Sequence, residues 1–231
     1  MKIGILGPSL GEAETLIGRL ENRTERLRGQ VRLFSGKLAG LPTVVGVSGV
    51  CKVNAAICAE TLLGEGADVL LVCGVAGGID PRLKIGDTVI CREIAYHDVD
   101  ISFLRDDPPY LESPWFLSDP DLVALAERTL GDEVGGKKIY SGRCVTGEAF
   151  IADEGRKEIV ERFDPLCTDM ETAAAAHVAK AHGIPFIAFR SITDTAEKSG
   201  IENFHENYLT SSTLAQACTE KFLLALAEES R

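Results

Sequence analysis

The stretch Val69-Leu70-Leu71-Val72-Cys73 is continuously apolar and runs into the glycine-rich segment Gly74-Val75-Ala76-Gly77-Gly78. Two further short runs, Lys2–Leu6 and Phe186–Phe189, are also largely apolar instead of alternating between polar and apolar residues. Such runs are typical of strands that are covered on both faces, as in a parallel sheet. In sheets of this kind ligands bind at the carboxyl ends of the strands, so a site is expected where these runs stop.

Segments with helical periodicity separate the apolar runs. Apolar residues recur at helical spacing early in the chain and near its end, at Ala13, Leu16, Ile17 and Leu20 and at Leu214, Cys218, Phe222 and Leu226. The alternating stretch Gln30–Val47 predicts a meander of antiparallel strands, and Thr88–Ala95 and Lys138–Val145 predict further strands. With no internal repeat or flexible linker, residues 1–231 are predicted to form one α/β domain, a central mixed twisted sheet flanked by helices in three α/β/α layers.

Residues 101–121 differ from the rest of the chain because they contain Pro108, Pro109, Pro114 and Pro120 with aromatic residues between them. Proline fixes the backbone angle φ and removes a hydrogen-bond donor, so this segment is predicted to be a long irregular loop. Long loops inside a compact domain are usually functional or disordered. The aromatic residues favour a functional loop.

The charge balance excludes one class of partner. The chain has 24 Lys and Arg against 35 Asp and Glu, a formal net charge of −11, which would repel a nucleic acid at long range. The chain has no apolar run of about 18 residues, the length that crosses a bilayer, and the apolar stretch after Lys2 ends too early for a secretory signal. We therefore expect a cytoplasmic protein that binds neither nucleic acid nor membrane.

Seven cysteines are spread along the chain at spacings that do not fit a zinc knuckle or a redox pair. We expect them to be reduced and mostly buried, and we expect no metal site. The glycine segments match neither the dinucleotide fingerprint nor the phosphate loop, which disfavours a nicotinamide, flavin or nucleoside triphosphate site. No cofactor is predicted.

Three carboxylates come after predicted strands, namely Glu12, Glu171 and Asp194. Each has a structural explanation. Glu12 could be a first-turn helix acid, Glu171 could complete a capping box with Thr168, and Asp194 could cap the next segment of the chain. Arg190, on the strand before Asp194, could merely pair with a nearby acid. From the residues alone both the structural and the functional interpretations stay open.

The ordered set of motifs resembles the 5′-methylthioadenosine/S-adenosylhomocysteine nucleosidases of the purine nucleoside phosphorylase family. The resemblance covers most of the chain and rests on MKIGILG with Glu12, Ser48–Ala56, Gly74–Gly78, Lys84–Asp87, Tyr96–Asp100, Thr146–Ile151, Asp169-Met170-Glu171 and Arg190–Asp194. It implies the nucleoside phosphorylase fold and hydrolysis of the bond between adenine and C1′ of the ribose. The substrate implied is a small adenine nucleoside with a 5′ thioether, and no cofactor is implied.

The resemblance also implies roles for residues of this chain. Asp194 would protonate the leaving purine, Glu12 would take a proton from the attacking water, and Arg190 would help to hold that water. Glu171 would bind the ribose hydroxyls. The other predicted substrate-binding residues are Phe150, which would stack on the purine, Ile151, which would read its edge, and Met170, Val50, Phe204, Val75 and Thr193.

In this family the loop that corresponds to 101–121 reaches a neighbouring subunit and covers its active site, so the resemblance implies a homodimer. The chain departs from the family pattern at Cys51, Val75 and Thr193, and in the loop after Asp100. Three alternatives remain. A phosphorylase would need arginines around a phosphate, a futalosine or aminofutalosine hydrolase would differ in the 5′ group, and a sensor would bind a nucleoside without cleaving it.

Overall fold

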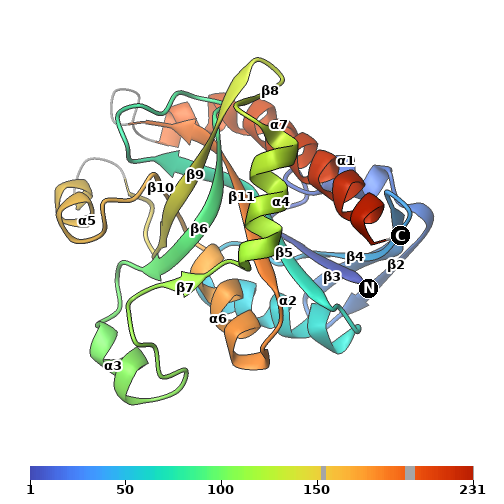
Figure 1. The fold of residues 1–231 in the computed structure, drawn as a ribbon, viewed down its shortest axis with the longest axis horizontal. Coiled ribbons are helices and arrows are strands. Elements are labelled where there is room, and N and C mark those ends of the chain that lie inside the picture. Colours follow the sequence, from blue (N-terminus) through green and yellow to red (C-terminus); the bar gives the residue numbers. More distant parts are fainter. Residues whose placement is uncertain (152–154, 196–200, 231) are drawn as a thin grey trace.

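The computed structural model describes residues 1–151, 155–195 and 201–230. Within them a mixed sheet runs through the molecule with helices on both sides (Figure 1). The strands are β1 (Ile3–Gly7), β2 (Glu21–Arg28), β3 (Val31–Leu38), β4 (Leu41–Val47), β5 (Val69–Gly78), β6 (Thr88–Tyr96), β7 (Phe116–Leu117), β8 (Glu133–Val134), β9 (Lys137–Thr146), β10 (Cys167–Asp169) and β11 (Phe186–Asp194). The helices are α1 (Glu14–Gly18), α2 (Lys52–Gly64), α3 (Ile101–Asp106), α4 (Pro120–Leu130), α5 (Arg156–Phe163), α6 (Thr172–His182) and α7 (Ile201–Glu229).

The strand order is β10-β9-β6-β11-β5-β1-β4-β3-β2. Strands β4, β1, β5 and β11 are parallel neighbours, as the continuous apolar runs predicted. Strands β2, β3 and β4 form an antiparallel meander, which confirms the prediction for Gln30–Val47 and extends it by one strand. Strand β10 pairs with both β9 and β5, so β5, β11, β6, β9 and β10 close into a ring.

The central strands are apolar throughout because each face of the sheet has its own core. Leu70 and Val72 of β5 belong to the core under α2 and α6, whereas Leu71 and Cys73 belong to the core under α1, α4 and α7. Successive side chains of a strand point to opposite faces, so both sets are buried only when helices cover both. The predicted three-layer α/β/α architecture is therefore confirmed.

The expectation of one irregular loop over 101–121 is wrong at both of its ends. Helix α3 begins at Ile101, and the Asp100 carboxylate accepts a hydrogen bond from the Ser102 N–H at its start. Helix α4 begins at Pro120, with Asp119 as its N-cap. Proline is favoured in the first turn of a helix, where its missing N–H would have no partner. Between these helices only the two-residue strand β7 is regular.

Six of the seven cysteines are buried, as predicted, and Cys51 is partly exposed. Among the described residues, no helix is long and apolar enough to cross a membrane.

Candidate active site

A cavity of about 290 Å³ lies at the carboxyl ends of β1, β5, β10 and β11. Its wall contains ten of the eleven residues predicted for the site, Glu12, Val50, Val75, Phe150, Ile151, Met170, Glu171, Thr193, Asp194 and Phe204. The eleventh, Arg190, is fully buried and contacts Glu12 and Glu171. Sequence reasoning did not assign the other lining residues, Pro8, Ala76, Gly77, Ala149, Thr168, Asp169 and Ile201.

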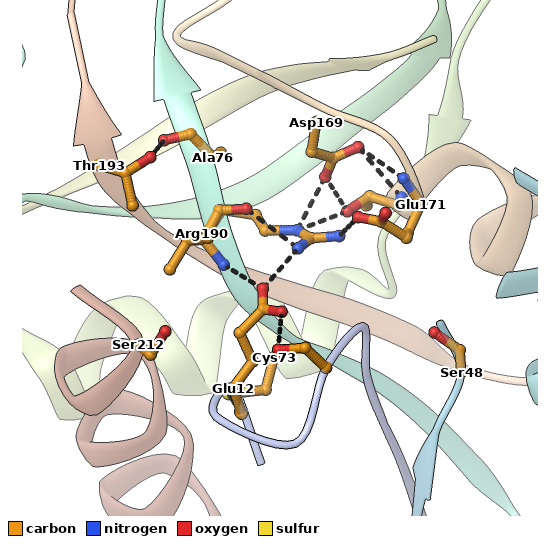
Figure 2. A network of polar contacts seen from close by, with 12 residues as sticks. Glu12, Ser48, Cys73, Ala76, Asp169, Glu171, Arg190, Thr193 and Ser212 are labelled. Atoms are coloured by element: carbon orange, nitrogen blue, oxygen red, sulfur yellow. Dashed lines mark hydrogen bonds and ion pairs between the residues drawn. The ribbon is translucent and has the colours of Figure 1, made fainter. Parts of the chain in front are cut away.

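The Arg190 guanidinium is surrounded by carboxylates (Figure 2). Its Nε lies 2.8 Å from Asp169 Oδ2, its Nη2 lies 3.2 Å from Glu171 Oε2, and its Nη1 lies 3.9 Å from Glu12 Oε1. Although burial disfavours its charge, these three carboxylates raise the pKa of Arg190. The guanidinium therefore stays charged and fixes the relative positions of the acids around it.

Asp169 shows why the predicted capping box is wrong. Thr168 lies within β10, and the Glu171 side chain makes no capping hydrogen bond to α6. Instead Asp169 Oδ1 accepts hydrogen bonds from the N–H groups of Glu171 and Thr172 at the start of α6. Asp169 thus caps the helix and binds Arg190, which leaves the Glu171 carboxylate free to face the cavity. Asp169 belongs to the motif Asp169-Met170-Glu171, and the interpretation that Arg190 pairs with a nearby acid was the signal that could have identified it.

Glu12 precedes α1, so it is not a first-turn helix acid as the structural explanation supposed. Its Oε1 accepts a hydrogen bond from the Val75 N–H at 2.9 Å, and its Oε2 accepts one from the Ser9 hydroxyl at 2.6 Å. Burial raises the pKa of Glu12, whereas Arg190 and these two hydrogen bonds act in the opposite direction. A buried carboxylate whose pKa is moved toward neutrality is suited to exchanging protons.

Glu171 is held by the backbone at the start of α2. Its Oε1 accepts a hydrogen bond from the Cys51 N–H at 2.9 Å, while its Oε2 faces Arg190. Burial raises the pKa of Glu171 to about 7. Cys51 makes this contact with φ of 83° and ψ of 162°, a backbone region that is occupied almost only by glycine. The departure from the family pattern at Cys51 therefore places strain beside the site.

We expect Cys51→Gly to raise the free energy of unfolding by about 1 kcal/mol, because relief of the backbone strain outweighs the added entropy of the unfolded chain. Cys51→Ala is the matched control, since it removes the thiol but keeps the side chain that causes the strain. Urea unfolding of the three proteins measures the difference. Equal stabilisation by Cys51→Ala, or destabilisation by Cys51→Gly, would show that the backbone is not strained.

Asp194 reaches the cavity through an irregularity at the end of β11. The register of β11 on β5 shifts between Ile192 and Asp194, so that Asp194 pairs with Gly77. Bulges of this kind redirect side chains beside active sites. A Cβ atom at Gly77 would lie 3.3 Å from Asp194 Oδ2, so glycine leaves room for the carboxylate. The alternative that Asp194 caps the next segment concerns residues 196–200, which lie outside the described ranges.

The two oxygens of Asp194 differ. Oδ1 accepts a hydrogen bond from the Thr193 hydroxyl at 2.9 Å, whereas the buried Oδ2 has no hydrogen-bond partner among the described residues. Burial raises the pKa of Asp194, and the Thr193 hydrogen bond opposes this rise. A raised pKa makes this carboxyl group easier to protonate than an exposed aspartate, and Oδ2 is placed to meet a ligand in the cavity.

The rest of the cavity wall is apolar. Phe150 and Phe204 meet edge to face, with ring centroids 6.1 Å apart, beside Val50 and Met170. Flat aromatic and sulfur-containing side chains suit a planar, weakly polar ligand. None of residues 101–121 belongs to this wall, so this segment does not cover the cavity of its own chain.

One group in the described part of the chain has the composition of a metal site. The sulfur atoms of Cys91, Cys144 and Cys167 lie within 4.8 Å of one another on β6, β9 and β10. All three thiols are fully buried in an apolar core. Hydrogen bonds to the other two thiols and burial keep the pKa of Cys144 well above its usual value, whereas burial acts to raise the pKa of Cys91 but hydrogen bonds to Cys144 and Cys167 lower it to about 6. Metal ions bind thiolates, so the raised pKa of Cys144 disfavours a centre in which all three cysteines bind a metal.

Comparison with known proteins adds to this geometry. Residues 2–227 match the family described as the phosphorylase superfamily. The chain belongs to this superfamily. This superfamily member is 38% identical over 212 residues to the 5′-methylthioadenosine/S-adenosylhomocysteine nucleosidase of Actinobacillus succinogenes, an alignment that covers 89% of this chain and 91% of the relative.

Two solved structures extend the comparison. The 5′-methylthioadenosine/S-adenosylhomocysteine nucleosidase of Neisseria meningitidis, in complex with methylthio-immucillin-A, has a TM-score of 0.89 and 29% identity, and the match covers 97% of this chain and 99% of the other. The futalosine hydrolase of Helicobacter pylori has a TM-score of 0.83 and 27% identity, over 99% and 98% of the two chains. The family and fold predicted from the sequence are confirmed.

Proposed function

We propose that the chain is a hydrolase that cleaves the N-glycosidic bond of 5′-methylthioadenosine and S-adenosylhomocysteine and releases adenine. The observation that carries this proposal is the pair of unlike carboxylates in one cavity. Burial raises the pKa of both, but Glu12 is held at both oxygens by hydrogen bonds and faces Arg190, whereas Asp194 Oδ2 has no hydrogen-bond partner among the described residues. The relatives that match nearly the full chain support the substrate class.

In the proposed reaction, water attacks C1′ as the bond from C1′ to the adenine nitrogen breaks. Glu12 accepts one proton of the water, and Asp194 donates a proton to N7 of the departing adenine, so no net charge is gained or lost. Arg190 keeps Glu12 in place and helps to hold the water. Separating the base from the acid in this way is the usual solution for glycosyl transfer through a cationic sugar.

The cavity wall supports roles in binding as well. Glu171, with its carboxylate fixed by Cys51 and Arg190, is placed to accept hydrogen bonds from the ribose hydroxyls. Phe150 would stack on adenine, while the Ile151 main chain would read its edge. The apolar residues Met170, Val50, Val75 and Phe204 would pack against the sugar and the 5′ group, and Thr193 would hold Asp194.

The charges around the cavity favour water over phosphate as the nucleophile. Four carboxylates, those of Glu12, Asp169, Glu171 and Asp194, line the described wall, and no lysine or arginine does. Arg190 behind it already faces three carboxylates. A phosphate dianion needs several unpaired, charge-assisted donors, so it would bind poorly here.

The structural match to a futalosine hydrolase favours one alternative, in which the same chemistry acts on a nucleoside with a different 5′ group. The two functions share the glycosidic bond and differ in what lies over the 5′ carbon. Activity on a panel of nucleosides separates them.

We predict that the purified protein releases adenine from methylthioadenosine and adenosylhomocysteine at the same rate with and without phosphate. Asp194→Asn and Glu12→Gln each lower kcat by at least about a hundredfold, because each removes one proton transfer. Glu14→Gln is the matched control, since Glu14 is exposed and lies two residues beyond Glu12. Adenine release is followed by chromatography, with inosine and aminofutalosine as competing substrates.

Strict dependence on phosphate would overturn the hydrolytic mechanism, and faster turnover of aminofutalosine would favour the alternative function. Nucleoside binding without adenine release would leave a sensor as the explanation. Near-normal rates in Asp194→Asn or Glu12→Gln would refute the role assigned to that residue.

The proposed enzyme is a homodimer in which residues 101–121 reach the neighbouring site. Large apolar side chains are exposed in and near this segment, with Phe103 67% and Leu117 69% exposed in the isolated chain. Exposed apolar side chains that gather in one region are typical of protein interfaces. None of residues 101–121 lines the cavity of its own chain, which supports a role for this segment at the site of the neighbouring subunit.

Sedimentation velocity should therefore show a dimer, and Phe103→Glu should shift it toward monomer because a charge would be buried at the interface. Leu27→Glu is the control, since Leu27 is 68% exposed on the far strand β2. A monomeric wild-type protein, or equal effects of both substitutions, would contradict the proposed interface.

A further inference from the structure

Glu12 depends on a side chain that lies outside the cavity wall. The loop after β1 turns back so that the Ser9 hydroxyl donates a hydrogen bond to Glu12 Oε2 at 2.6 Å. The Val75 N–H donates to the other oxygen, Oε1. The carboxylate is therefore held at both oxygens, and each hydrogen bond favours its ionised form.

Ser9 in turn is held by Tyr208 of α7, 199 residues further along the chain. The hydroxyl groups of Ser9 and Tyr208 share a hydrogen bond. Ser9 has one proton, which it gives to Glu12, so Tyr208 must be the donor to Ser9. Burial raises the pKa of Tyr208, so its hydroxyl keeps its proton. The result is a directed chain from Tyr208 to Ser9 to Glu12, in which each hydrogen bond strengthens the next.

The packing around Tyr208 keeps it over the loop. A Cβ atom at Gly11 would lie 2.7 Å from Tyr208 Oη, so glycine provides the space that the tyrosine occupies. The Tyr208 ring also packs against Phe204, with centroids 5.5 Å apart. Two turns further along α7, Gln216 Nε2 donates to the Gly11 carbonyl, and its Oε1 accepts from the Thr15 N–H. Helix α7 is thus fastened to the loop that carries Ser9 and Glu12.

We propose that Ser9 and Tyr208 are positioning residues that keep Glu12 ionised and aimed into the cavity. The inference rests on the proposed function, in which Glu12 acts as the base. Ser9 and Tyr208 are absent from the described cavity wall, so they act on the reaction through Glu12. Several titratable and charged groups lie around Glu12. They are Arg190 of β11, Cys73 of β5 and Tyr208 of α7, together with Glu171 and Asp169 on the other side of the Arg190 guanidinium.

The test is the pH dependence of kcat/KM for adenine release. The base must be ionised, so its pKa sets the acidic limb, whereas the acid sets the alkaline limb. Ser9→Ala removes a hydrogen bond to the ionised carboxylate and should move the acidic limb upward by about one pH unit. At pH values below the acidic limb, kcat/KM of Ser9→Ala is then about tenfold lower than that of the wild type, and this difference disappears above the acidic limb. The alkaline limb stays in place.

Tyr208→Phe should move the acidic limb in the same direction by a smaller amount, because it removes only the donor to Ser9. The double variant should match Ser9→Ala, since Tyr208 acts through the Ser9 hydroxyl. Thr213→Ala is the matched control on α7, where the exposed Thr213 hydroxyl bonds only the Leu209 carbonyl among the described contacts. This control should keep the wild-type profile.

An acidic limb that stays in place in Ser9→Ala, or a rate that falls equally at every pH, would overturn the proposal. Additive shifts in the double variant would overturn the directed chain. A wild-type protein that releases no adenine at any pH refutes the proposed function instead. The two failures are therefore distinguishable.

Discussion

The ion pairs of one fully buried guanidinium organise the site. Arg190 meets Asp169, Glu171 and Glu12, which come from the end of β10, the start of α6 and the loop after β1. Removing a charge from water is costly unless partners surround it, so the arginine and its carboxylates stabilise one another only when all are in place. This constraint acts on Glu12 and Glu171, which are also held by hydrogen bonds from Ser9, Val75 and Cys51.

The topology of the sheet brings Arg190 and its three carboxylates together. Strand β10 has only three residues, yet its pairing with both β9 and β5 closes the ring of strands and brings Asp169 to the end of β11. Gly77 and the register shift in β11 then leave Asp194 beside the same cavity, with Oδ2 unbonded by any described residue. Base and acid consequently occupy one cavity in unlike surroundings. Burial raises the pKa of both, but Glu12 is hydrogen-bonded at both oxygens and faces Arg190, whereas Asp194 accepts a hydrogen bond at Oδ1 from Thr193.

Much of this could be predicted from the sequence, because the signals were either local or repeated. The apolar runs of β1, β5 and β11 revealed strands covered on both faces, and the ordered motifs indicated which strand ends carry Glu12, Glu171 and Asp194. Local sequence patterns gave a wrong prediction where a contact with another part of the fold decided the structure. Thr168 and Glu171 fit a capping box, but Asp169 caps α6.

Other features leave no local signal in the sequence. The contact between Ser9 and Tyr208 joins residues 199 positions apart, and neither side chain is distinctive in its own segment. Strand β10 is too short for its periodicity to be detected. In each case the deciding interaction is long-range, and only the folded chain brings the partners together.

Arg190 and its carboxylates are expected to stabilise one another as a unit. A double-mutant cycle of Arg190→Met and Asp169→Asn, with urea unfolding at neutral pH as the readout, tests it most directly. Arg190→Met alone should cost about 3–5 kcal/mol, because it leaves buried carboxylates unpaired. The loss of stability in the double variant should be smaller, by at least about 1 kcal/mol, than the sum of the losses in the two single variants. Additive losses would contradict the claim, because the buried arginine and aspartate would then contribute independently.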